Sequence, residues 1–231
     1  MSLSHSPSIV TNGLVLCLDA GNTKSYNAGI STTAWNDLSG RGNTGTLTNG
    51  PTYSSSNGGS IVFDGVDDFI TLSTATNFSG DFSYCAWVYR SVVSPNGYTN
   101  LFTSTLQNEQ YQLDLSGIQG AMGMYVNGAY NSIQSNIIPL NTWVNLVWIR
   151  RNTGLYGYLN GVEKFNPSNG NNAGYSTVST AVSMVNKIGA YSSGTSYNLN
   201  GKIANASIYN RALTAAEIQQ NFNALRGRFS I

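Results

Sequence analysis

Residues 143–149 read WVNLVWI, and this stretch decides the class of fold. Successive side chains of a β-strand point to opposite faces of a sheet, so a strand with one wet face alternates apolar and polar residues. Here both sides are mostly apolar: one carries Trp143, Val147 and Ile149, and the other Val144, Leu146 and Trp148. We therefore expect a central strand that is covered on both faces.

Further stretches show β-branched and aromatic residues in the period of a strand. Residues 82–89 read FSYCAWVY and place Phe82, Tyr84, Ala86 and Val88 on one side. Residues 156–162 read as a strand that enters a hairpin at an Asn-Gly pair. The other stretches are residues 14–19, 61–63, 70–72, 184–190 and 202–209.

The Asn-Gly pair recurs along the whole chain and marks the turns. Asparagine and glycine both tolerate the positive φ that tight turns between antiparallel strands require. About a dozen strands at close spacing, with no helical period between them, predict an all-β, antiparallel sandwich of two sheets. The pairs begin at Asn12, Asn49, Asn57, Asn96, Asn127, Asn160, Asn169 and Asn200.

One short helix is expected near the carboxyl end, over residues 213–225. Thr214 is a good N-cap, and Glu217 three residues later completes a capping box. Leu213 and Ile218 occupy the positions of a hydrophobic staple. Ile218, Phe222 and Leu225 then form one apolar stripe, so this helix should pack on the edge or rim of a sheet.

The composition excludes several classes of protein. Only 9% of the 231 residues are charged, and the formal net charge is +1. A nucleic-acid-binding protein would show a basic stripe, which is missing here. No apolar stretch approaches the roughly 18 residues of a membrane span. The first ten residues also lack the charged and apolar regions of a secretory signal peptide.

We expect one domain, because no linker rich in proline or charge divides the chain. Residues 1–12 form an amino-terminal extension, and residues 13–231 form a single sandwich domain. The segment from residue 2 to residue 10 is a plausible anchor to a partner or to sister subunits. Cys17 and Cys85 are too few for a disulfide scaffold, and free thiols are favoured over a bridge between them.

Several motifs in a fixed order carry a resemblance to a known family. The chain resembles the laminin G-like (LamG) domains of the concanavalin A-like lectin/glucanase superfamily, which implies a jelly roll of two curved antiparallel sheets. Its opening and its Asn-Arg-Ala-Leu ending also resemble virion structural proteins of tailed bacteriophages. The motifs occupy residues 13–20, 35–45, 63–69, 82–87, 158–161 and 201–213, with Trp143 between them.

The residues argue against catalysis. Retaining hydrolases of the resembled superfamily carry a Glu-x-Asp-x-x-Glu run, whose alternate carboxylates face the same side of one strand. The chain has no such run, and its glutamates are Glu109, Glu163 and Glu217. The single histidine, His5, lies in the amino-terminal extension. We therefore expect no catalytic residues and no enzyme activity.

Three aspartates in five residues, Asp64, Asp67 and Asp68, lie on an expected turn between two strands. In a structural interpretation Asp64 accepts backbone hydrogen bonds and Gly65 takes a positive φ, with Asp67 and Asp68 in solvent.

In a functional interpretation the turn binds calcium, which takes six to eight oxygen ligands. Many LamG domains bind calcium, so the resemblance supports this interpretation. Asp64, Asp67, Asp37 and Asn43 are then the candidate ligands. Relatives often have acidic residues where this chain has Ala204 and Asn205, which weakens the calcium interpretation. Both interpretations remain open.

Sugar sites in such folds combine aromatic rings with amide, carboxylate and backbone groups. Trp35, Tyr191 and Tyr197 fall in loop-like segments and are the candidate ligand contacts. Each could instead serve only to pack the fold.

Together these features predict a non-catalytic, lectin-like virion structural protein that acts in phage surface decoration or adhesion. It would assemble in the host cytoplasm and contact other virion proteins, sister subunits or cell-surface glycans. The alternative is a carbohydrate-binding module of a bacterial extracellular protein. A glycoside hydrolase with an unusual carboxylate pair is a third possibility.

Overall fold

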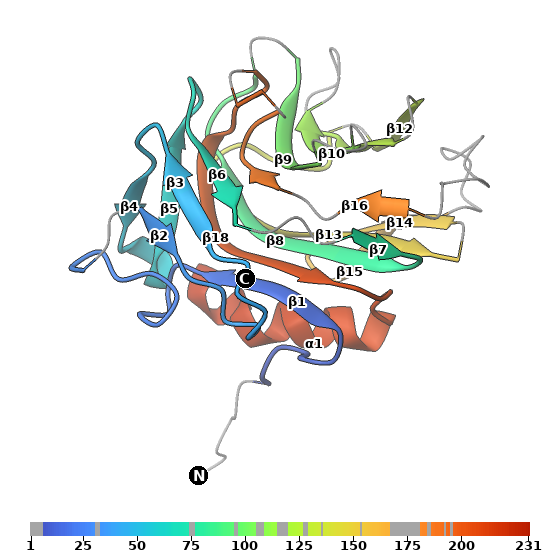
Figure 1. The fold of residues 1–231 in the computed structure, drawn as a ribbon. Helices are drawn as coiled ribbons and strands as arrows, with labels where there is room; N and C mark the ends of the chain where they lie inside the picture. Colours follow the sequence, from blue (N-terminus) through green and yellow to red (C-terminus); the bar gives the residue numbers. More distant parts are fainter. Residues whose placement is uncertain are drawn as a thin grey trace.

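In the part of the chain that the structure describes, two antiparallel sheets of eight strands each pack face to face (Figure 1). We call them sheet 1 and sheet 2. Sheet 1 has the order β15 (Val162–Phe165), β14 (Gly154–Leu159), β13 (Trp143–Arg151), β8 (Phe82–Arg90), β18 (Asn200–Tyr209), β5 (Ser60–Asp64) and β4 (Thr52–Ser54), and β1 (Leu14–Asp19) also pairs with β18.

Sheet 2 is the other layer of the sandwich. Its order is β12 (Ala129–Gln134), β11 (Met122–Val126), β10 (Glu109–Asp114), β9 (Thr99–Ser104), β17 (Lys187–Ile188), β6 (Phe69–Leu72), β3 (Gly45–Thr48) and β2 (Ala34–Trp35). A separate pair joins β16 (Ala181–Ser183) to β7 (Asn77–Ser79), and the helical elements are η1 (Ser56–Gly58), α1 (Ala215–Leu225) and η2 (Arg226–Phe229). The predicted all-β sandwich with one helix is confirmed.

This computed structural model describes residues 7–30, 33–73, 77–94, 97–104, 109–114, 120–126, 129–134, 136–152, 154–166, 181–183, 186–191, 193–194 and 196–231. His5 and residues 2–6 of the expected anchor lie outside these ranges. The division into an extension and one domain stays a prediction. Among the described residues, no helix is long and apolar enough to cross a membrane.

The predicted central strand β13 lies between β8 and β14 and is buried along almost its whole length. Its neighbour β8 pairs with β18, which is the longest described strand. One edge of β18 pairs with β8, and the other edge is shared end to end by β5 and β1. The register of β18 shifts between Ile203 and Asn205, near the point where β5 gives way to β1.

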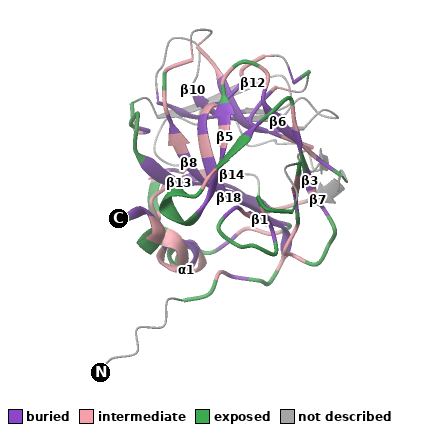
Figure 2. Cartoon of the chain, turned by 90° about the vertical axis from the view of Figure 1, so that its left-hand side faces the viewer, coloured by how far each residue is buried: buried purple, intermediate pink, exposed green. Residues whose placement is uncertain are grey.

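The space between the sheets is filled by apolar side chains from both layers, and Figure 2 shows buried residues along β8, β13 and β18. Tyr84 illustrates the packing, because its ring lies 5.5 Å from that of Phe102 and 4.5 Å from that of Tyr111. The largest fully buried core side chains on the two sheets include Trp148, Tyr84, Phe63, Phe82 and Phe165 from sheet 1, and Trp35, Tyr111 and Phe102 from sheet 2.

The outer face of sheet 1 is covered by α1 and η2 (Figure 1). The ring of Trp87 on β8 stacks on Phe229 at 4.2 Å and on Phe222 at 5.6 Å. Arg228 secures η2 through a 2.7 Å ion pair with Asp19. Both faces of sheet 1 are therefore buried in its centre, as the apolar pattern of β13 predicts.

Helix α1 begins as the sequence predicts. Thr214 is the N-cap, and the capping box with Glu217 is present. Leu213 and Ile218 are both fully buried in one cluster, as a hydrophobic staple requires. Arg211 adds a bidentate ion pair to Glu217, with N–O distances of 2.6 and 2.9 Å.

Cys17 and Cys85 are free and buried, as expected. Cys17 on β1 is the register partner of Ser207 on β18, and Ser207 is in turn the partner of Cys85 on β8. Two strand spacings of about 4.8 Å therefore separate the cysteines, which is more than a disulfide can span. Burial raises the pKa of the Cys17 thiol to about 11.

The amino-terminal segment leaves the sandwich on the side of α1 (Figure 1). The backbone N–H of Val10 donates to Asn221 Oδ1 at 2.8 Å, and the Tyr209 hydroxyl donates to the Val10 carbonyl at 2.9 Å. Val10 is buried against the helix. Val10, which belongs to the expected amino-terminal extension, is thus docked on the described domain.

Not every Asn-Gly pair is a turn. Asn160 and Gly161 both have positive φ and join β14 to β15, as predicted. The prediction is wrong for Asn200 and Gly201, which begin β18 instead. A Cβ on Gly201 would lie 2.1 Å from the Tyr89 carbonyl oxygen, so the glycine is required by close packing of two strands. The residues that open the pairs at 96, 127 and 169 lie outside the described ranges.

We predict that Gly201→Ala lowers the free energy of unfolding by about 2–3 kcal/mol, because the added methyl group must push β18 away from β8. Gly227→Ala is the matched control, since nothing lies within 4 Å of a Cβ at that position. Urea unfolding of both variants checks this prediction. Equal stability of the two variants would show that the sheet absorbs the methyl group.

Acid should weaken the cap of α1. Mainly through the hydrogen bonds from Arg211, the pKa of Glu217 is lowered to about 2 from the ordinary value of 4.5. A lowered folded-state pKa stabilises the fold above pH 4.5, and this stabilisation is lost as the pH falls toward 2.

Glu217→Gln keeps a side chain that can complete the capping box but removes the titration. We expect a shallower loss of stability over this pH range in urea unfolding than the wild type shows. A Glu217→Gln slope equal to that of the wild type would contradict the role of the ion pair.

Candidate functional site

A pocket of about 370 Å³ opens at the rim of the sandwich, where β5 and β8 end and β18 begins. We call it the rim pocket. Its walls come from the end of β5 and the β5–β6 turn, residues after β8, the start of β9 and the segment that leads into β18. The lining residues are Asp64, Gly65, Val66, Val92, Ser94, Thr99, Ser196, Tyr197, Asn198 and Asn200.

The β5–β6 turn forms one wall. Gly65 has a φ of +82°, and a Cβ there would lie 2.7 Å from the Asn200 Cβ. Asp64 Oδ1 accepts the Val66 N–H at 2.8 Å, and Asn200 Nδ2 donates to the Asp64 carbonyl at 2.8 Å. These contacts match the turn of the structural interpretation and place Val66, which is 71% exposed, on the lip of the pocket.

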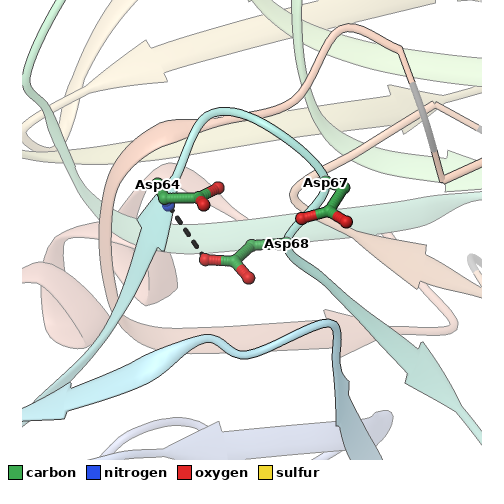
Figure 3. A group of neighbouring side chains, drawn as sticks. All are labelled: Asp64, Asp67 and Asp68. Atoms are coloured by element: carbon green, nitrogen blue, oxygen red, sulfur yellow. Dashed lines mark hydrogen bonds between the residues drawn. The ribbon is translucent and has the colours of Figure 1, made fainter.

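Asp68 lies under this turn and is only 3% exposed, so the expectation that it is in solvent is wrong. Its Oδ2 accepts the Asp64 N–H at 2.9 Å (Figure 3). Burial raises the pKa of the Asp68 carboxyl, and the nearby charges of Asp64 and Asp67 raise it further. The backbone hydrogen bond explains why a carboxyl group is placed where solvent is scarce.

The three carboxylates lie close together around the turn (Figure 3). One oxygen from each of Asp64, Asp67 and Asp68 lies within 4.8 Å of the others. Oxygen ligands of one calcium ion lie 2.3–2.6 Å from it, so such a group could share an ion. The chemistry of the donors fits part of a calcium shell, and calcium binding stays a prediction.

The other two expected calcium ligands are used elsewhere. Asp37 orders its own loop, because its Oδ1 accepts the Cys17 N–H and its Oδ2 accepts the Asn43 N–H. Asn43 is buried and donates through Nδ2 to the Val15 carbonyl at 2.7 Å. Asp37 is not a member of the aspartate cluster in the described structure. These hydrogen bonds correct the expected joint site: Asp37 and Asn43 hold β1 against the following loop.

The three aromatic residues expected to contact a ligand lie in different environments. Trp35 is fully buried between the sheets and is unavailable to a ligand, so the expectation for this residue is wrong. Tyr197 lines the rim pocket. Its ring lies 4.9 Å from that of Tyr98 and 5.5 Å from that of Tyr191, which makes Tyr191 a neighbour of the pocket wall.

Tyr197 has a φ of +54°, a conformation that costs a bulky residue on the order of 1–3 kcal/mol. Its neighbours hold it there. The Tyr197 carbonyl accepts the Asn100 N–H at 2.9 Å, and the Ser196 carbonyl accepts the Tyr191 N–H at 2.9 Å. Strained backbone of this kind occurs mainly at functional sites.

Sequence reasoning missed most of the polar lining. Asn198 and Asn200 line the pocket from the segment that opens β18, Ser94 follows β8, and Thr99 begins β9. The signal that could have found Asn200 was its Asn-Gly pair, which was interpreted as a turn. The others carry no distinctive pattern, because they meet only where β5, β8, β9 and β18 come together at the rim.

The rim pocket does not hold the carboxylate pair that glycoside hydrolysis requires. Only Asp64 of the aspartate cluster lines it, whereas Asp68 is buried under the turn. Hydrolysis needs two carboxyl groups on either side of the cleaved bond. The side chains of Glu109 and Asp114 lie outside the described part of the structure, as does His5.

A laminin G model, described as the concanavalin A-like lectin/glucanases superfamily, matches residues 63–219. This range covers more than half of the chain and runs from within β5 to within α1. The chain belongs to the concanavalin A-like lectin/glucanases superfamily. The resemblance drawn from the motifs is thereby confirmed at the level of the superfamily. No curated protein sequence matches the chain.

Solved structures share this superfamily fold at low sequence identity. Domain 4 of AbnA, a GH43 extracellular arabinanase from Geobacillus stearothermophilus solved with arabinotriose, is 19% identical with a TM-score of 0.64. The match covers 90% of this chain and 97% of that domain.

Two larger proteins contain a similar unit. Trypanosoma rangeli sialidase is 16% identical with a TM-score of 0.58, and the match covers 93% of this chain but 33% of the sialidase. The receptor-binding domain of botulinum neurotoxin type G is 18% identical with a TM-score of 0.60, covering 91% of this chain and 51% of that domain. These likenesses show the fold alone, and the chain spans a third to a half of these two proteins.

The aspartate cluster generates a test of calcium binding. A ligand that binds only the folded state stabilises it, by about 2.7 kcal/mol at a concentration one hundred times its Kd. We predict a higher melting temperature in calcium than in chelator. An unchanged melting temperature would contradict calcium binding, and the structural interpretation would be the one that remains.

Asp68→Asn separates the two interpretations further. The amide oxygen of this variant can still accept the Asp64 N–H, and the substitution removes the buried carboxylate charge of Asp68. Because the folded-state pKa of Asp68 is raised, its ionised form destabilises the fold above that pKa. We expect an equal or higher melting temperature in chelator and a reduced shift with calcium. An undiminished calcium shift in this variant would place the ion elsewhere.

Proposed function

We propose that this chain is a non-catalytic glycan-binding module and that the rim pocket is its binding site. The observation that carries the proposal is Tyr197, which is held at a positive φ and faces a pocket otherwise lined by small polar and aliphatic groups. Binding sites commonly combine one or two aromatic faces with a few fixed polar groups. Glycine or asparagine at this position would adopt the same φ at a lower cost. A tyrosine that is retained despite the strain is therefore expected to have a function.

The geometry suits a sugar. The tyrosine ring offers an apolar face to sugar C–H groups, and its hydroxyl can form a hydrogen bond. Asp64, Asn198 and Asn200 surround it with groups that bind sugar hydroxyls. The cavity of about 370 Å³ lies near the lower end of the range of small-molecule sites, so it suits one or two sugar units.

The absence of catalysis is part of this proposal. It is supported by the single carboxylate in the pocket lining and by the missing Glu-x-Asp-x-x-Glu run. Incubation with a glycan panel should release no new reducing ends. Hydrolysis that is lost in Asp64→Asn would revive the hydrolase interpretation.

We further propose that the module acts on a virion surface, in decoration or adhesion. Support comes from the opening and closing motifs and from a surface that depends on neutral polar residues, with 9% charged content. The partners would be other virion proteins or sister subunits, with assembly in the host cytoplasm. Mass spectrometry of purified particles tests this part by itself.

A second role has a specific observation in its favour. The similar arabinanase domain is matched over 97% of its length and was solved with arabinotriose, so a carbohydrate-binding module of an extracellular bacterial protein is the alternative. Both roles use the same pocket, and arabinotriose belongs in any binding panel.

Tyr197→Asn tests the proposed site. Asparagine adopts positive φ readily, so the variant relieves the strain and removes the ring. We expect an unchanged or higher melting temperature together with a loss of glycan affinity of about tenfold or more on a glycan array and in titration calorimetry. Such opposite effects are typical of a residue kept for binding.

Tyr53→Asn is the matched control. Tyr53 is 37% exposed, stacks on Tyr26 at 5.2 Å and is not part of the rim pocket. Its loss should leave glycan affinity unchanged. Retained affinity in Tyr197→Asn would exclude the rim pocket as the binding site.

A further inference from the structure

The rim pocket carries charge of only one sign. Among the described residues that line it, Asp64 carries the one carboxylate, and none is a lysine or arginine. Carboxylate oxygens of Asp67 and Asp68 lie within 4.8 Å of the Asp64 carboxylate, directly behind the same turn. A cleft bordered by charges of one sign focuses their field on a ligand that enters it.

The neutral groups of the lining reinforce this bias. Asn198 donates through Nδ2 to the Gly194 carbonyl at 3.1 Å, and Asn200 donates through Nδ2 to the Asp64 carbonyl at 2.8 Å. Each bond uses one of the two N–H groups of Nδ2, so each amide keeps its Oδ1 acceptor and one N–H donor for a ligand. Together with the Asp64 carboxylate, the two amide oxygens suit a partner that donates hydrogen bonds.

We propose that the rim pocket selects uncharged glycans and rejects glycans that carry a carboxylate or sulfate where they enter it. Sugar hydroxyls donate hydrogen bonds to carboxylate and amide oxygens, whereas ionised carboxylates and sulfates only accept them. An anionic sugar would bring a negative charge to a negative cluster and would place acceptor oxygens beside the Asp64 carboxylate. The inference rests on the proposed glycan-binding function and adds the class of ligand.

The net charge beside the pocket stays negative when the turn binds one calcium ion. One divalent calcium ion among three ionised carboxylates would leave one net negative charge at the turn. The discrimination between neutral and anionic glycans should thus persist in calcium, although it should be smaller than in chelator. This dependence gives the test a second variable that a purely steric preference would not follow.

The experiment compares matched pairs of glycans on the wild-type protein. Array binding first identifies a neutral oligosaccharide ligand, and calorimetry then compares it with the same oligosaccharide carrying a terminal sialic acid or a sulfate. We expect the anionic partner to bind about tenfold more weakly at low ionic strength. The gap should narrow as salt is added, because the screening length falls from about 30 Å at 0.01 M to about 8 Å at 0.15 M.

Two variants separate charge from shape. Asp64→Asn keeps an oxygen that can accept the Val66 N–H and removes the charge nearest to the ligand, so the ratio of neutral to anionic affinity should fall several-fold. Val66→Lys adds a cation at a side chain that is 71% exposed and should lower the ratio further. Asp81→Asn is the matched control: its Oδ1 accepts the Asn152 N–H at 2.7 Å, and it lies outside the pocket lining.

The outcomes are distinguishable. Equal or tighter binding of the anionic partner, or a ratio that neither variant nor salt changes, overturns the inference while leaving glycan binding in place. Binding of no glycan of either class overturns the proposed function and the inference together. A ratio that falls in Asp64→Asn and Val66→Lys but not in Asp81→Asn supports the inference.

Discussion

The pairing of β18 is the constraint on which the rest of the structure depends. This strand is buried on both faces, so each backbone N–H and carbonyl group along it needs a hydrogen-bond partner. One edge is satisfied by β8 and the other by two different strands, β5 and β1, joined end to end beside a register shift. The first half of β18 therefore leads to the rim pocket, while the second half lies beneath the helix.

This division separates the rim pocket from the helix-covered end along a single strand. Near Asn200 the chain presents Asn198 and Asn200 to the pocket, while Leu199 between them is buried in the core. Near Tyr209 it is fixed by Val10, Asn221 and the cluster under α1. The aspartate turn is attached to the start of β18 by the hydrogen bond from Asn200 to the Asp64 carbonyl, and the Tyr197 carbonyl accepts the N–H of Asn100 on β9, so both positions follow from the sheets.

The sequence predicts those features that depend on local chemistry. The double-sided apolar pattern around Trp148, the capping box at Thr214 and the positive φ of Gly65 are all found in the structure. Features that depend on contacts between residues far apart in the chain could not be predicted from the sequence. Burial of Asp68 depends on the backbone of Asp64 above it, and nothing in the local sequence distinguishes it from the exposed aspartates.

The candidate site was predicted only in part for the same reason. Asp64 and Tyr197 are 133 positions apart in the chain and meet because β5 and β18 are neighbours in sheet 1. Trp35 and Asp37 belong to an equally distinctive motif, yet that motif serves the core and the first loop. A motif indicates that residues are constrained, and only the topology reveals whether the constraint is a ligand or the fold.

The partnership of β1 with β18 has a consequence for biosynthesis. Leu14 and Tyr209 are register partners although almost the whole domain separates them in sequence. At a translation rate of about 5–20 residues per second, the ribosome needs roughly 10–40 s to deliver the second strand after the first. During that interval the backbone groups of the apolar strand β1 lack their hydrogen-bond partners, and the strand can pair wrongly with other nascent chains. Slower elongation or scarce chaperones should thus reduce the yield of this protein before any difference in its final stability becomes visible.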